Sequence, residues 1–167
     1  LLSFYETVNF FSLNIHGEKA LVAGLAGYLY ARSDVNISPY LHHFLDEENK
    51  HMIYFGRFCS YYAGKVYPDK KMSFPRDYAP GEEEFMFFVK VMIFEETVDR
   101  YNKSMGEDTR LVPLAREINR LHHIDESRHL AFGRSMLRWL ADRYSDQWSN
   151  DVKNSISQYI SHYLQST

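Results

Sequence analysis

The chain has 167 residues, of which 45% are hydrophobic and 16% aromatic, so it can bury a sizeable core and we expect a single domain over residues 1–167. Its net charge of −3 provides no basic surface of the kind that binds phosphate, so we expect no nucleic-acid partner. With Cys59 as the only cysteine and no apolar stretch of about 20 residues, the sequence excludes an intramolecular disulfide, favours a cytoplasmic location and predicts no membrane partner.

The first half of the chain predicts two long helices. Apolar residues recur at three- and four-residue spacing over 4–31, which is typical of a helix with one buried face. This pattern is already under way near the opening Leu1-Leu2-Ser3, which lacks a methionine and suggests a truncated N-terminus. Ser38-Pro39 is a typical helix start, with a capping serine followed by proline in the first turn, and predicts a second helix over 38–64.

The second half predicts three more helices after a long connection. Residues 65–81 contain three prolines and predict a crossover of the kind found in ferritin-like bundles. A third helix is predicted over 82–104, because it opens with three glutamates and because Gly106 follows its expected end. A fourth is predicted from Pro113 to beyond Trp139. A fifth, over 146–164, is amphipathic without inward polar residues and is expected to act as a cover or interface.

Polar residues interrupt the apolar stripes of four predicted helices. The second and fourth helices each carry a Glu-x-x-His element, and steps of three and four residues return to the same side of a helix. The first and third helices each add a single glutamate among apolar neighbours. In chain order these inward residues are Glu18, Glu48, His51, Glu95, Glu126 and His129.

On the third helix, Glu96 is an alternative to Glu95 as the inward residue. Glu95 lies nearly opposite Lys90 and Thr97 on the helical wheel, whereas Glu96 lies toward Arg100. We therefore favour Glu95 and leave Glu96 open.

Four carboxylates in one core need compensating positive charge, because burying an unpaired carboxylate costs several kcal/mol. The inward stripes contain no matching set of lysines or arginines. Two divalent cations would balance four carboxylates, and neutral imidazoles would complete their coordination. One glutamate from each of two helices with Glu-x-x-His from two others is the arrangement of di-iron and di-manganese bundles. We expect two iron ions, with manganese as an alternative metal and a metal-free bundle with surface charges as the alternative structure.

A third histidine, His122, stands four residues before Glu126 and therefore on the same helix face as that residue and His129. This motif, with the alternation of single glutamates and Glu-x-x-His elements, resembles the para-aminobenzoate N-oxygenase family within the ferritin-like di-iron superfamily. The resemblance implies an all-α fold, namely a ferritin-like four-helix bundle with an additional C-terminal helix. It also implies seven metal ligands: Glu18, Glu48, His51, Glu95, His122, Glu126 and His129.

The neighbours of this motif have alternatives. His122 could instead be a buried, hydrogen-bonded histidine without metal. His123 should point about 100° away, and either support a metal ligand from behind or pack against another helix. Asp125 resembles the aspartate that holds a ligand imidazole in many di-iron proteins, with an exposed acid as the alternative.

The resemblance implies a non-haem di-iron oxygenase that activates O2 and oxygenates an organic substrate, with N-oxygenation of an aromatic amine as the specific expectation. We expect an external electron donor, because the sequence has no flavin or nicotinamide motif, and we expect a homodimer. The layout also resembles ribonucleotide reductase small subunits, but Phe55 stands where those proteins keep a radical tyrosine. The remaining alternative is a ferroxidase or another iron-binding ferritin-like protein.

Overall fold

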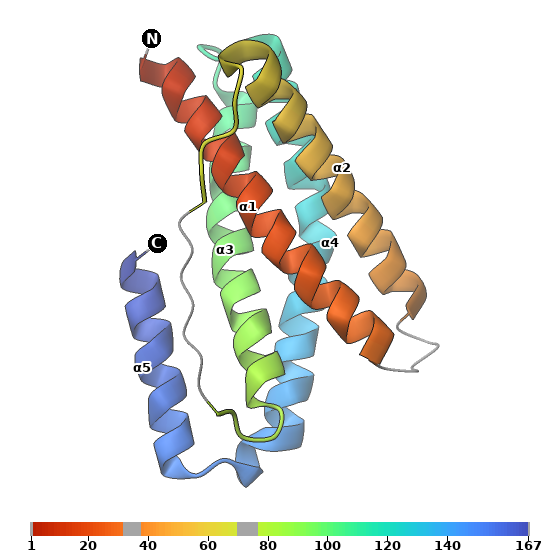
Figure 1. Ribbon diagram of the computed structural model, residues 1–167, viewed down its shortest axis with the longest axis vertical. Helices are drawn as coiled ribbons and strands as arrows, with labels where there is room; N and C mark the ends of the chain where they lie inside the picture. Colours follow the sequence, from red (N-terminus) through yellow and green to blue (C-terminus); the bar gives the residue numbers. More distant parts are fainter. Residues whose placement is uncertain (1, 32–37, 70–76, 167) are drawn as a thin grey trace. The chain divides into compact units, whose positions relative to one another are not determined.

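The computed structural model describes residues 2–31, 38–69 and 77–166. Within these residues the chain forms five α-helices and one short 3-10 helix, with no β-strand (Figure 1). The expected all-α, ferritin-like fold with an additional C-terminal helix is confirmed. None of the described helices is long and apolar enough to cross a membrane. The helices are α1 (Leu2–Ala31), α2 (Ser38–Ala63), α3 (Glu82–Glu107), α4 (Pro113–Tyr144) and α5 (Asn150–Ser166).

The boundaries of α1 and α2 agree with the prediction to within two residues. Gly64, with φ of 67°, follows the last residue of α2 and donates its backbone N–H to the Ser60 carbonyl oxygen at 3.1 Å. A left-handed glycine at this position satisfies a terminal helix carbonyl, which explains why α2 ends here. The predicted cap by the Ser38 side chain lies outside the described side chains, and residues 70–76 of the predicted crossover lie outside the described residues.

Two predicted boundaries were wrong. α3 continues to Glu107, so that Gly106 lies inside its last turn, where a Cβ atom would come within 3.3 Å of the Arg120 backbone nitrogen. This close approach gives Gly106 a packing role instead of a terminating one. The fifth helix begins later than predicted, because residues 145–147 form a 3-10 helix and the Ser149 hydroxyl accepts a hydrogen bond from the Val152 backbone N–H at 3.2 Å. A serine in this position caps the start of a helix.

The residues group into two compact units. Unit 1 comprises Leu1–Lys71 and Val98–Asp125, and unit 2 comprises Met72–Thr97 and Glu126–Thr167. Unit 1 thus contains α1, α2, the end of α3 and the start of α4, whereas unit 2 contains the start of α3, the end of α4 and α5. The expectation of a single domain stays a prediction.

In unit 1, α1 and α2 lie side by side and bury an aromatic core (Figure 1). The ring of Phe11 lies 4.8 Å from that of Phe55 and 4.9 Å from that of Phe58. Fully burying one such side chain contributes roughly 1.5–3 kcal/mol. Because Glu18 follows Phe11 by seven residues on the same face of α1, this packing also turns Glu18 inward.

In unit 2, α5 packs against the start of α3. Met86 from α3 forms a buried cluster with Trp148 and Ile156, and the Trp148 indole N–H donates to the Pro80 carbonyl oxygen at 3.0 Å. A large amphipathic side chain with its polar atom satisfied is a stable anchor for the connection to α5. The fifth helix therefore covers part of α3 within this unit.

Candidate metal centre

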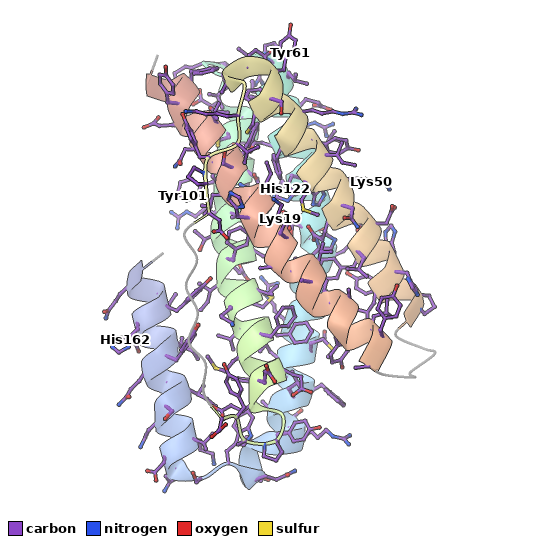
Figure 2. The ribbon with its side chains drawn as sticks, viewed as in Figure 1. Lys19, Lys50, Tyr61, Tyr101, His122 and His162 are labelled. Atoms are coloured by element: carbon purple, nitrogen blue, oxygen red, sulfur yellow. The ribbon has the colours of Figure 1, made fainter. Side chains whose placement is uncertain are left out.

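Unit 1 buries four of the candidate ligands completely or nearly so. Glu18, Glu48, His51 and His122 have exposed fractions of 0 to 2%. Nε2 of His122 lies 3.3 Å from a Glu18 carboxylate oxygen, and Nδ1 of His51 lies 3.2 Å from a Glu48 carboxylate oxygen. One atom each of Glu18, His51 and His122 lie within 4.8 Å of one another, a spacing at which they could share a metal ion. Figure 2 shows His122 inside the helices of this unit.

The electrostatics of Glu18 fit a cation site. Burial raises the pKa of Glu18 well above its usual 4.5, and the nearby Glu48 carboxylate raises it further. Hydrogen bonding to His122 lowers the pKa, but only partly offsets this rise. No lysine or arginine is buried anywhere in the part of the chain that the structure describes. A metal ion beside these two buried carboxylates would supply positive charge that favours their ionised forms.

Unit 2 buries the other three candidate ligands, whose exposed fractions are 0 to 2%. On α4, both carboxylate oxygens of Glu126 lie 3.2–3.3 Å from Nδ1 of His129. On α3, Glu95 is buried, whereas Glu96 is exposed and pairs with Arg134 on the surface. Glu95 is therefore the inward residue of the two, and its role as a ligand stays a prediction.

Two neighbours of the motif occupy the places expected from the sequence. Asp125 lies 3.2 Å from Nε2 of His51 through its Oδ2 atom, so a carboxylate from α4 holds a candidate ligand imidazole of α2. With Nε2 held in this way, Nδ1 of His51 faces Glu48. His123 instead points to α3, where its Nδ1 lies 2.6 Å from Asp99 Oδ1.

Asn102, which contacts His122, was not among the residues predicted from the sequence. This residue is fully buried, and its Nδ2 atom lies 2.5 Å from Nδ1 of His122. The ring of Phe55 packs edge-on against the same imidazole at 5.0 Å. Helical spacing could have identified Asn102, because it follows Glu95 by seven residues and so lies on the same helix face.

Two further buried asparagines, Asn14 and Asn119, were missed as well. Each donates its amide N–H to the backbone carbonyl of the preceding turn, Asn14 to Phe10 at 2.7 Å and Asn119 to Ala115 at 2.8 Å. Helical spacing could have found them too, because each lies one turn before a candidate ligand.

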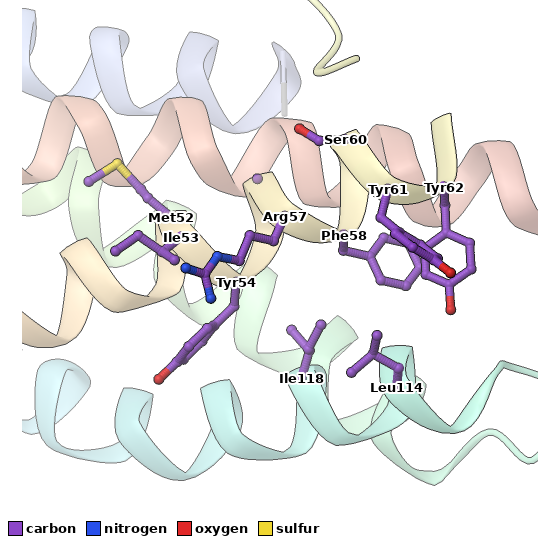
Figure 3. A pocket seen from close by; sticks show the side chains of 11 residues that line it. Met52, Ile53, Tyr54, Arg57, Phe58, Ser60, Tyr61, Tyr62, Leu114 and Ile118 are labelled. Carbon is purple, nitrogen blue, oxygen red and sulfur yellow. The ribbon is translucent and has the colours of Figure 1, made fainter. Parts of the chain in front are cut away.

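An apolar groove of about 1050 Å³ lies on unit 1 between α2 and the start of α4. Tyr54 and Arg57 extend from α2 on the side where Leu114 and Ile118 of α4 lie (Figure 3). None of the residues that line this groove is a candidate metal ligand. The groove is therefore a separate feature of the surface.

The helical fold and these buried carboxylates and histidines define a protein of the ferritin-like class with groups suited to metal binding. The sequence matches the family model described as P-aminobenzoate N-oxygenase AurF over residues 1–160. The chain therefore belongs to this family of ferritin-like oxygenases, as the resemblance of its motifs predicted. No curated protein and no solved structure matches the chain.

Proposed function

We propose that this chain is a di-iron oxygenase. The observation that carries the proposal is the fully buried Glu18 beside Glu48, with His122 as its other partner and no buried lysine or arginine among the described residues. Membership of an oxygenase family gives independent support. A bundle with incidental surface charges would expose these carboxylates, and would not leave them buried at a cost of several kcal/mol each.

The proposed centre holds two metal ions. Four carboxylates neutralise two divalent ions, and a mixed set of oxygen and imidazole donors suits iron, with manganese as the alternative. The proposed ligands are Glu18, Glu48, His51, Glu95, His122, Glu126 and His129.

When bound, a pair of iron ions would supply the oxygen chemistry of the reaction, using electrons from an external donor. The chain would contribute three things of its own. Asp125 would accept a hydrogen bond from Nε2–H of His51 and so keep Nδ1 turned to the site. Phe55 packs against His122 and excludes water from that side. The buried carboxylates hold the site in an environment where charge interactions are strong.

We propose an aromatic amine as the substrate and oxygenation at its nitrogen as the reaction, on the basis of the family description. An external donor would supply electrons, because the sequence carries no flavin or nicotinamide motif. A cytoplasmic homodimer completes the proposal.

Metal analysis tests the proposal directly. Protein purified without chelator, or offered ferrous iron anaerobically, should hold about two metal ions per chain. Glu48→Gln and Glu126→Gln should each lower this content, whereas the exposed Glu96→Gln should not. Wild-type protein that retained no iron would contradict the di-iron centre.

A turnover assay then separates oxygenase from ferroxidase. With p-aminobenzoate, O2 and a chemical reductant, an N-oxygenase should consume O2 in proportion to an N-oxygenated product detected by mass spectrometry. A ferroxidase would instead oxidise many ferrous ions per chain and would form no such product.

A further inference from the structure

Two candidate ligand histidines of unit 1 are held at their outer nitrogens by chemically different groups. His51 is held by the carboxylate of Asp125 at 3.2 Å, whereas His122 is held by the amide of Asn102 at 2.5 Å. Both histidines are buried, and their rings pack edge-on at 4.3 Å. The difference matters because an ionised carboxylate can only accept a hydrogen bond, whereas an amide can donate or accept.

The described arrangement has the Asn102 amide donating. Its Nδ2 atom faces Nδ1 of His122, and in this arrangement the ring nitrogen would accept and the proton of a neutral imidazole would sit on Nε2. That proton faces a Glu18 carboxylate oxygen at 3.3 Å. In this state Nε2 has no lone pair for a metal ion.

The Asn102 side chain is placed to adopt the opposite orientation. Its Oδ1 atom is buried without a hydrogen-bond partner among the described residues, and a buried unsatisfied polar atom costs about 1–3 kcal/mol. Amide oxygen and nitrogen are nearly the same size, so turning the amide over needs no additional volume. After that turn, Oδ1 would face Nδ1 of His122 and would accept a hydrogen bond from Nδ1–H.

We propose that Asn102 is a positioning residue that switches His122 between two tautomers, with the inference resting on the proposed metal centre. Without metal, the amide donates to Nδ1, and Nε2–H faces Glu18. With metal, the imidazole would carry its proton on Nδ1, Oδ1 of Asn102 would accept a hydrogen bond from Nδ1–H, and the lone pair of Nε2 would be free for the ion. The proton moves from one ring nitrogen to the other, so none is released and the imidazole stays neutral.

His122 and His51 differ in whether their hydrogen-bond partner must reorient before metal binds. Asp125 accepts from Nε2–H in either state, so His51 keeps Nδ1 ready for metal. His122 becomes a ligand only together with the turn of Asn102. The third histidine is therefore a conditional ligand of the centre.

Nuclear magnetic resonance of ¹⁵N-histidine-labelled protein tests this, because long-range ¹⁵N–¹H couplings report which ring nitrogen carries the proton. Zn²⁺ serves as a diamagnetic probe, and His122→Phe identifies the His122 signals. We expect the His122 proton on Nε2 in metal-free wild-type protein and on Nδ1 in zinc-loaded protein. Asn102→Asp, which can only accept, should hold the proton on Nδ1 in both states.

Zinc affinity provides the second measurement. Asn102→Leu can neither donate nor accept, so its zinc dissociation constant should rise about 10–100-fold, the usual effect of losing the partner of a ligand histidine. Asn102→Asp should restore tight binding. Asn119→Leu is the matched control, because it also removes a fully buried asparagine of unit 1, but one that donates to a backbone carbonyl.

Three results would overturn the role of Asn102. The first is a His122 proton on the same nitrogen with and without zinc, and the second is equal weakening of zinc binding by Asn102→Leu and Asn119→Leu. The third, which decides the matter if Asn102→Leu does not fold, is a metal-free Asn102→Asp protein with the proton still on Nε2. Two metal ions in wild-type protein with any of these results would leave the proposed function standing, whereas wild-type protein that binds neither zinc nor iron would overturn both.

Discussion

Replacing His122 by phenylalanine separates a metal ligand from a buried histidine that only packs. The substitution keeps an aromatic ring that can retain the edge-on contact with Phe55, now at 5.0 Å. It removes both ring nitrogens, which lie 2.5 Å from Asn102 Nδ2 and 3.3 Å from a Glu18 oxygen. If His122 is a ligand, six others remain, so we expect the protein to keep most of its metal with a changed iron spectrum.

The structure also sets the expected stability of the metal-free variants. Loss of the Asn102 contact leaves a buried amide without its partner, which costs about 1–3 kcal/mol in His122→Phe. His122→Ala also loses the aromatic contact with Phe55, worth about 0.5–1.5 kcal/mol, and should cost roughly 1.5–4.5 kcal/mol. Urea unfolding of the metal-free proteins measures these differences.

Mössbauer spectra of the ferrous-loaded proteins decide the question, with His123→Ala as the control. His123 is 37% exposed and bonds to Asp99, away from Glu18, so its loss should leave the iron spectrum unchanged. Wild-type and His122→Phe proteins with the same metal content and identical iron spectra would refute coordination by His122. The other six proposed ligands do not depend on this result.

Three further outcomes are expected. Burial and the Glu48 carboxylate raise the pKa of Glu18 above its usual 4.5. In metal-free protein, the contribution of Glu18 to the free energy of unfolding should therefore be fully present below pH 4.5 and should be lost as pH rises through the raised pKa. Urea unfolding against pH should show that decline in wild-type protein and a flatter profile in Glu18→Gln, and equal profiles would contradict the assignment. Phe55 has no phenol group, so electron paramagnetic resonance after exposure to O2 should show no persistent tyrosyl radical, and such a signal would favour a reductase-like function. Glu95→Gln should lower the iron content while Glu96→Gln leaves it unchanged, and the reverse result would show that Glu96 is the ligand.

The sequence was sufficient to predict the helices and the inward direction of the seven candidate ligands. Glu48 and His51 illustrate the reason, because a step of three residues on a helix keeps two side chains on one face whatever lies around it. The same local rule favoured Glu95 over Glu96 as the inward residue, and in the structure Glu95 is buried and Glu96 is exposed. It failed at Gly106, whose place in the last turn of α3 depends on the approach of the Arg120 backbone.

Only the tertiary structure decided which atoms of the site face one another. Asp125 reaches His51 across 74 residues of chain, and Asn102 reaches His122 across 20, each pair joining two different helices. Helical periodicity gives the face on which a side chain lies, but the rotation and separation of packed helices determine its partner. For this reason the inward glutamates and histidines could be predicted from their spacing. Which ring nitrogen of each histidine contacts which neighbour depends on how the helices pack, and could not be predicted from the sequence.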